Sequence, residues 1–173
     1  MGFTFVPEYY FDTFEGASVE FLKSLGIKGI ILDVDNTLEP YENPTPSPKV
    51  AEWFSALREA NISAAIVSNN DAARIDLFNK DLGLPAFSKA KKPFKKNILK
   101  AMEILGTDSS NTIFMGDQIF TDVWAAHNAK IPAILVPPIK DKRDLLTRFK
   151  RLLEVPIMKK YIRRHKSNDR NEK

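Results

Sequence analysis

Two carboxylates stand one residue apart at the end of an apolar run in the first quarter of the chain. The run extends from Gly29 to Val34, contains Asp33 and is followed by Asp35. Its short length and isoleucine content predict a buried strand, in which Asp33 and Asp35 would point to the same face. Two like charges this close repel each other, so the pair indicates a site for a cation. The alternative is a plain strand end followed by an Asn36-Thr37 turn.

Three later segments place polar groups beside apolar stretches, in positions suited to bind an anion or a metal ion. Ser68 and Asn69 follow one such stretch where a strand is expected to turn into a helix, and N–H groups at this point would face an anion. Asp117 follows another stretch and supplies a hard oxygen ligand of the kind that Mg²⁺ prefers, and Asp122 lies further on. Lys92 stands in a run of lysines, whose usual interpretation is a solvated face.

The four segments together resemble, in order, the four motifs of the haloacid dehalogenase-like phosphatases. They extend over roughly residues 28–136 of the chain. With the proline-rich loop over 39–48 and the step Ala90-Lys91-Lys92-Pro93, the chain is similar to the YqeG branch of the capless class IIIA group. The matching residues are Asp33-Val34-Asp35-Asn36-Thr37, Ile66-Val67-Ser68-Asn69-Asn70, Lys92-Pro93 and Met115-Gly116-Asp117 with Asp122.

The resemblance implies a phosphomonoesterase with a covalent intermediate and Mg²⁺ as its cofactor. Asp33 would be the nucleophile that forms an aspartyl-phosphate, and Asp35 would act first as the acid and then as the base. Asp33, the main-chain carbonyl of Asp35 and Asp117 would hold the Mg²⁺ ion. Lys92 would be catalytic as well, because it supplies positive charge to the transferring phosphoryl group.

The other expected site residues bind the phosphate or support the loops. Ser68 and the Asn69 amide, together with Lys92, are assigned to the substrate phosphate. Thr37 would fix its loop through its hydroxyl group. Asp122 would hold a metal-bound water, orient Lys92 or cap the next helix.

A phospholipid head group is a candidate substrate, because the YqeG branch is similar to the phosphatidylglycerophosphate phosphatases of mitochondria. Nothing in the motifs selects glycerol, a sugar or a nucleotide. Expected helices fill most of the sequence between the motifs, which leaves no room for a cap domain. The site is therefore expected to be open to a bulky phosphate ester, with loop 39–48 as its only lid-like element.

Strands and helices alternate along the chain, which predicts an α/β fold of the Rossmann-like kind, with three α/β/α layers around a central parallel sheet. Ligands of such sheets bind where the carboxyl ends of the strands meet. The length of 173 residues favours one phosphatase domain over 1–155, followed by a basic tail over 156–173. The expected strands are 29–34, 62–67, 112–115 and 133–136, and the expected helices are 17–25, 49–60, 71–82 (capped by Asn69 or Asn70), 94–105 and 122–128.

Positive charge is concentrated near the end of the sequence. Residues 140–173 hold 13 basic and 5 acidic residues, a net charge of +8, whereas residues 1–139 hold 13 basic and 17 acidic residues, a net charge of −4. A basic amphipathic helix over 145–153, ended by Pro156, can lie on an anionic membrane or pack on its own domain. No apolar run is long enough to span a bilayer. The expected location is cytoplasmic, with peripheral contact at the inner face of the membrane.

Two other classes of protein remain open. An RNA- or ribosome-associated protein would use the basic tail, with the hydrolase site vestigial, and would bind RNA in a salt-dependent manner. A receiver-type signalling domain would be phosphorylated on Asp33, although Asp35 supplies an acid/base group that a stable phosphate would avoid. The absence of cysteine excludes disulfides, thiolate metal sites and a cysteine nucleophile.

Overall fold

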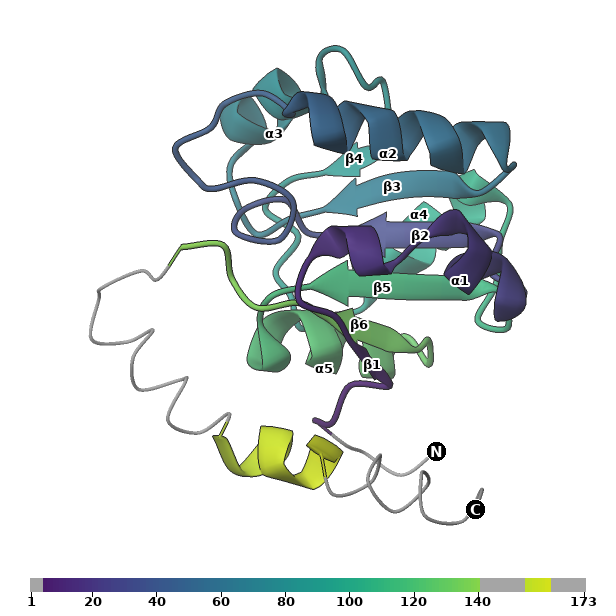
Figure 1. Ribbon diagram of the computed structural model, residues 1–173. Coiled ribbons are helices and arrows are strands. Elements are labelled where there is room, and N and C mark those ends of the chain that lie inside the picture. The colour runs from purple at the N-terminus through teal and green to yellow at the C-terminus, as the bar shows by residue number, and fades with distance from the viewer. Residues whose placement is uncertain (1–4, 141–154, 163–173) are drawn as a thin grey trace.

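The computed structural model describes residues 5–140 and 155–162, and a parallel sheet of six strands forms its middle layer (Figure 1). The strand order is β1-β6-β5-β2-β3-β4. The strands are β1 (Tyr9–Tyr10), β2 (Gly29–Leu32), β3 (Ser63–Val67), β4 (Ala86–Phe87), β5 (Thr112–Gly116) and β6 (Ala133–Leu135). The helices are α1 (Val19–Ser24), α2 (Pro48–Glu59), α3 (Ala72–Asn79), α4 (Lys96–Leu105) and α5 (Trp124–Asn128), with a 3₁₀-helix at Phe14–Gly16 and a π-helix at Ile119–Val123.

Helices cover both faces of the sheet. On one face, α1, α2 and α3 bury Leu22, Phe54 and Phe78 in the core, and on the other face α4 and α5 bury Ile98 and Ala125. Each helix therefore presents an apolar stripe to the sheet, as expected of an amphipathic surface helix. This arrangement confirms the predicted three-layer α/β/α fold.

The central strand β2 explains why the first apolar run is so continuous. Its side chains alternate between the two cores: Ile30 and Leu32 join one and Ile31 joins the other, and all three are fully buried. A parallel strand that is covered on both faces needs apolar residues at every position. Leu32 pairs with Ile66 of β3 and with Met115 of β5, so these three strands end at the same level.

The two outer strands were not predicted from the sequence. Both β1 and β4 have only two residues, which is too short for a periodic hydrophobic pattern to appear. A carboxylate fixes β1 beside β6: Glu8 accepts a hydrogen bond from the Ala133 amide at 2.8 Å and lies 3.0 Å from Nε2 of His127. The long-range contacts of Glu8 thus add to the main-chain pairing of β1 with β6.

Several helix boundaries differ from the prediction. The cap of α3 is Asp71, whose carboxylate accepts from the Arg74 amide at 2.9 Å, and not Asn69 or Asn70. The helix that was expected from residue 94 begins at Lys96. The helix that was expected from Asp122 is preceded by a π-helix, which contains Asp122. Helix α1 begins two residues later than expected, at Val19, and α2 agrees with its prediction to within one residue at each end.

Residues 155–162 form a helix beside the outer strand β1 (Figure 1). Pro156 lies within this helix. Ile157 and Met158 pack against the core, and the ring of Tyr161 lies 6.2 Å from that of Tyr10. The amphipathic helix that was predicted over 145–153 lies outside the described residues. Within the described part of the chain, no helix is both long and apolar enough to cross a membrane.

Candidate active site

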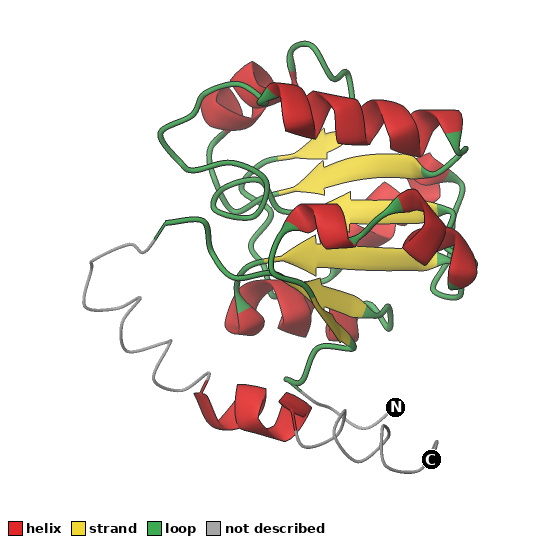
Figure 2. Cartoon of the chain, viewed as in Figure 1, coloured by secondary structure: helices red, strands yellow, loops and turns green. Residues whose placement is uncertain are grey.

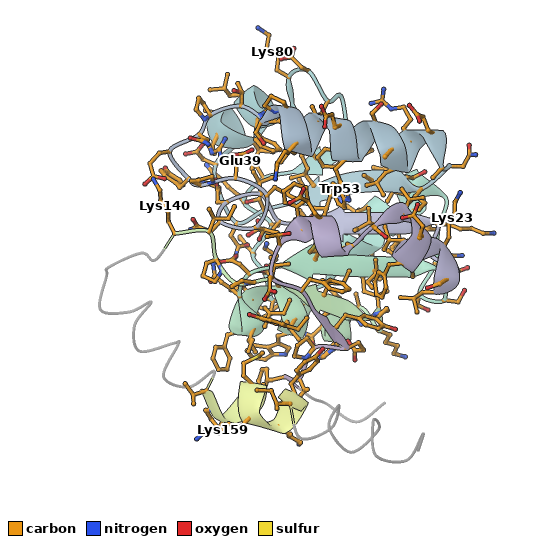
Figure 3. The ribbon with its side chains drawn as sticks, in the orientation of Figure 1. Lys23, Glu39, Trp53, Lys80, Lys140 and Lys159 are labelled. Atoms are coloured by element: carbon orange, nitrogen blue, oxygen red, sulfur yellow. The ribbon has the colours of Figure 1, made fainter. Side chains whose placement is uncertain are left out.

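The predicted site residues converge at the carboxyl edge of the sheet. Asp33, Ser68 and Asp117 each directly follow a strand, namely β2, β3 and β5, and these strands end in register. Figure 2 shows the longer loops of the domain at this end of the strands. Glu39, at the start of one of these loops, lies there as well (Figure 3).

Three buried carboxylates form a cluster around one lysine. Oxygen atoms of Asp33, Asp117 and Asp122 lie within 4.8 Å of one another. The ammonium group of Lys92 lies 3.1 Å from Oδ1 of Asp33 and 2.7 Å from Oδ1 of Asp122, and its side chain is 2% exposed. One cation therefore faces three acidic groups in a space from which water is largely excluded.

The pKa values in this cluster follow from burial and charge. Burial alone would lower the pKa of Lys92, but the carboxylates of Asp122 and Asp33 outweigh it and raise that pKa above its usual value. Burial raises the pKa of Asp117 well above its usual value, and the charges of Asp122 and Asp33 raise it further. Burial also raises the pKa of Asp122, against the opposing effect of Lys92.

The raised pKa of Lys92 favours its charged form, whereas the raised pKa of Asp122 favours its neutral form, because burial and the charge of Asp33 outweigh the effect of Lys92 there. The short contact and the raised pKa of the lysine favour the ionised pair. Negative charge remains in excess, which a divalent cation among the carboxylates would balance. The donor set consists of oxygen atoms, as Mg²⁺ requires.

The segment that was assigned to phosphate lies beside this cluster. The side chain of Asn69 accepts a hydrogen bond from the Lys92 amide at 2.7 Å and donates to the Lys92 carbonyl at 3.3 Å. Asn69 therefore holds the main chain that presents Lys92. The buried Ser68 accepts a bond from the Asn70 amide at 3.2 Å. A cleft of about 360 Å³ runs along these groups and is lined by Asp33, Asp35, Asn36, Tyr41, Ser68, Asn69, Asn70 and Gln118.

The side chain of Asp35 does not join the carboxylate cluster. Its Oδ2 accepts a bond from the side chain of Asn70 at 2.7 Å, and its Oδ1 accepts from Nε of Arg74 at 3.0 Å and lies 2.9 Å from Nη2. The same guanidinium group donates through Nη1 to the Pro44 carbonyl at 3.0 Å. The expected contact of Asp35 with a metal ion was through its main-chain carbonyl and stays a prediction.

The sequence analysis overlooked Arg74, which ties the Asp35 carboxylate to loop 39–48. No motif marks it, since it stands in the first turn of α3 among ordinary helical residues. Glu39 was overlooked as well. Its buried carboxylate accepts from the Ser47 amide at 2.8 Å and from the Asn43 side chain at 2.9 Å, so it closes loop 39–48 on itself.

Thr37 and Gly116 hold the cluster together from two sides. The Thr37 hydroxyl donates to Oδ1 of Asp117 at 3.3 Å, which joins the loop after β2 to the loop after β5. Gly116 lies against the Asp122 side chain so closely that any Cβ at this position would overlap it. Asp122 is 1% exposed, and its Oδ2 accepts from the Gln118 amide at 3.0 Å. It therefore supports the start of the π-helix and contacts Lys92 at the same time.

Comparison with known proteins agrees with this geometry. The family model of the haloacid dehalogenase-like hydrolases matches residues 12–136. The probable phosphatase YqeG of Bacillus subtilis is 35% identical over 154 residues, which cover 89% of this chain and 90% of that protein. A chloroplastic/mitochondrial phosphatidylglycerophosphate phosphatase of Arabidopsis thaliana is 24% identical over 84% of this chain and 44% of its own length.

The fold also recurs in solved structures. The 3-deoxy-D-manno-octulosonate 8-phosphate phosphatase of Moraxella catarrhalis, solved with magnesium and phosphate ions, superimposes with a TM-score of 0.54 at 20% identity. The match covers 70% of this chain and 75% of that one. With the family match over most of the sequence, the chain belongs to the haloacid dehalogenase-like hydrolases and is a phosphatase of that family.

Proposed function

We propose that this chain is a Mg²⁺-dependent phosphomonoesterase that works through an aspartyl-phosphate intermediate and acts on a bulky phosphate ester. The observation that carries the proposal is the contact of one buried lysine with both Asp33 and Asp122 at the edge of an open cleft. A phosphoryl group above Asp33 would meet a nucleophile and a fixed positive charge together, which phosphoryl transfer requires.

In the first half-reaction an oxygen of Asp33 attacks the phosphorus atom, and the bond between phosphorus and the ester oxygen breaks. Asp35 gives its proton to the leaving alkoxide. Lys92 stabilises the charge on the phosphoryl oxygens, with the Ser68 hydroxyl and the Asn69 N–H on the same anion. The products are the free alcohol and an acyl phosphate on Asp33.

In the second half-reaction Asp35 takes a proton from water, and the water oxygen attacks the phosphorus atom of the aspartyl-phosphate. The bond between Asp33 and phosphorus breaks, which releases inorganic phosphate and restores both carboxyl groups. The hydrogen bonds from Asn70 and Arg74 fix the position of the Asp35 carboxylate and hold it apart from the buried cluster.

Mg²⁺ would be held by Asp33, by Asp117 and by the main-chain carbonyl of Asp35, with Asp122 close enough to fix a bound water. When bound, the ion supplies positive charge that offsets the repulsion between these carboxylates and a phosphate dianion. The excess of buried acidic groups over Lys92 supports this assignment. Thr37 would keep Asp117 turned toward the ion through its hydroxyl group.

The proposed substrate is a phosphate ester with a large or lipid-like leaving group, and phosphatidylglycerophosphate is the candidate. No separate cap domain covers the cleft in the described part of the chain, so a bulky group can extend from it. The similarity to a plant phosphatidylglycerophosphate phosphatase supports a phospholipid. An RNA-associated protein with a vestigial site is disfavoured, because the contact of Lys92 with Asp33 supports a working site.

The test is phosphate release from a panel of esters with Mg²⁺, with a chelator and with Asp33→Asn. The panel contains phosphatidylglycerophosphate, a sugar phosphate, a nucleotide and a chromogenic monoester. Asp76→Asn, an acidic residue exposed on α3, is the matched control and should retain full turnover. Turnover that survives either the chelator or Asp33→Asn would contradict the mechanism.

A further inference from the structure

A lysine-rich segment lies directly beside the proposed phosphate site. Residues 89–100 contain six lysines and no acidic residue. One of them, Lys92, points inward to the cluster, whereas the other five are exposed. None of these five has an ion-pair partner among the described residues. The exposed members are Lys89, Lys91, Lys95, Lys96 and Lys100.

An aromatic ring stands in the middle of these lysines. Phe94 is 71% exposed, more than any other large apolar side chain of the described residues. An exposed ring would need no explanation in a segment with few hydrogen bonds, but several hydrogen bonds fix the position of this segment. The Phe94 amide donates to the Lys91 carbonyl at 3.0 Å, and side chains of Asn128 and Asn97 bind the carbonyls of Pro93 and Ala90 at 2.9 and 3.2 Å.

The segment belongs to the same edge of the sheet as the cleft. It follows β4 and carries Lys92, which reaches Asp33. Two other exposed apolar side chains lie at this edge: Tyr41 lines the cleft, and Ile139 is anchored there by a bond from its amide to the Asn36 carbonyl at 3.0 Å. The apolar groups and the lysines thus lie at the edge of the sheet that holds the cleft, where the main chain of Lys89 bonds to Asn70 of its lining.

We propose that Phe94 with Lys89, Lys91, Lys95 and Lys96 forms a docking surface for an anionic lipid bilayer. The lysines would lie among the acidic head groups while the ring enters the interface, where aromatic side chains are stable. In this position the cleft would face the bilayer. This proposal rests on the proposed function, because a phosphatase that acts on phospholipids must bring its active site to the lipid head groups.

The charge and the ring fit a bilayer better than a single-stranded nucleic acid. A nucleic-acid platform stacks successive bases on several aromatic side chains along a groove, whereas residues 89–100 offer one ring only. A flat anionic surface needs a cluster of positive charge and an apolar group that can insert, and both are present here.

The test is co-sedimentation of the full chain with vesicles of phosphatidylcholine alone or mixed with phosphatidylglycerol. Lys91→Gln/Lys95→Gln should lower the partition coefficient about 25-fold, at roughly fivefold for each lysine. Phe94→Ser should lower it on the order of tenfold. Binding of the wild type should weaken as salt is added, because salt screens surface charge.

Matched controls come from the opposite end of the strands. Ile104 is 60% exposed at the far end of α4, and Lys23 and Lys28 are exposed before β2. Figure 3 shows Lys23 at the end of the sheet away from Glu39. Ile104→Ser and Lys23→Gln/Lys28→Gln should leave vesicle binding unchanged. All variants should hydrolyse a soluble chromogenic phosphate like the wild type.

Several results would overturn the docking surface. The first is a set of docking-surface variants that bind vesicles like the wild type, and the second is wild-type binding that does not depend on phosphatidylglycerol. The third is that the variants lose affinity for RNA, measured in parallel, while they keep their affinity for vesicles. If the docking-surface variants lost turnover of the soluble chromogenic phosphate as strongly as they lost vesicle binding, the proposal would also be overturned, because these residues would then belong to the active site. If vesicle binding depended on the docking surface but no phosphate ester were hydrolysed, the docking surface would be supported and the proposed function would be refuted. The two proposals are thus tested separately.

Discussion

Replacing Lys92 by methionine tests whether the carboxylate cluster depends on this single cation. Methionine has a similar length and fits a buried position, so the change removes the charge and leaves the volume nearly constant. Asp33, Asp117 and Asp122 then remain buried together without the ammonium group. We expect a large loss of stability in the metal-free protein.

The size of the loss follows from the contacts of Lys92. At an effective dielectric constant of about 20, a charge pair at 2.7 Å gains roughly 6 kcal/mol and one at 3.1 Å gains roughly 5 kcal/mol. Removing the buried ions from water costs several kcal/mol each and offsets much of this gain. Removing one partner of a buried pair costs about 3–5 kcal/mol in the free energy of unfolding, which we expect for Lys92→Met.

The loss should depend on pH, with a definite sign. In the wild type the raised pKa of Lys92 gives stability that is fully present below its unfolded value of about 10.4 and is lost as pH rises through the folded pKa. In the variant, Asp122 loses the cation that lowers its pKa, so the folded state takes up protons above about pH 4 that the unfolded state does not bind. The deficit of the variant should therefore be larger near pH 8 than near pH 5.

The assay is urea unfolding of metal-free protein at both pH values, with Lys91→Met as the control. Lys91 is the exposed neighbour of Lys92, and its replacement should change the unfolding free energy by at most about 0.5 kcal/mol. A deficit for Lys92→Met below about 1 kcal/mol, or one that does not change with pH, would refute the electrostatic account of the cluster.

Two further predictions concern the metal ion and the acid/base group. Mg²⁺ should raise the melting temperature more near pH 8 than near pH 5.5, because burial raises the pKa values of Asp117 and Asp122 and protons then compete with the ion. Thermal melts with and without Mg²⁺ measure this effect, and an equal shift of the melting temperature at both pH values would contradict it. Arg74→Lys should lower kcat by about tenfold to a hundredfold with little change in KM, because lysine cannot donate to Asp35 and to the Pro44 carbonyl at once. Steady-state kinetics test this prediction, and Arg58→Lys, at an exposed position, is the control that should not change kcat.

The sheet and the position of the cleft could be predicted because they depend on local patterns. The apolar run of β2 has a continuous sequence signature, and the polar residues after β2, β3 and β5 had to meet once the strands were parallel. The edge strands could not be predicted in this way. Their two residues carry no periodicity, and β1 is placed by contacts with residues more than 100 positions later, namely its pairing with β6 and the contact of Glu8 with His127.

The environment of Asp35 was hidden for a related reason. Nothing in the sequence says that Arg74 reaches back over a loop to a carboxylate 39 positions earlier, because that contact depends on how α3 packs against the sheet. The contacts of the Glu39 carboxylate could not be predicted either, because its partners lie in a loop without regular structure. Motifs thus mark the reacting groups, whereas tertiary packing decides which neighbours orient them.

The shortness of the outer strands has a consequence for the behaviour of the protein at high concentration. An exposed sheet edge offers unpaired N–H and C=O groups to a second chain, and long edges promote aggregation through strand addition. Here β4 and β1 expose only two residues each, and the helix over 155–162 lies beside β1 with its Tyr161 ring near Tyr10. Truncation before this helix would uncover both that edge and the apolar surface under Ile157 and Met158. A shortened protein should therefore keep the chain through residue 162.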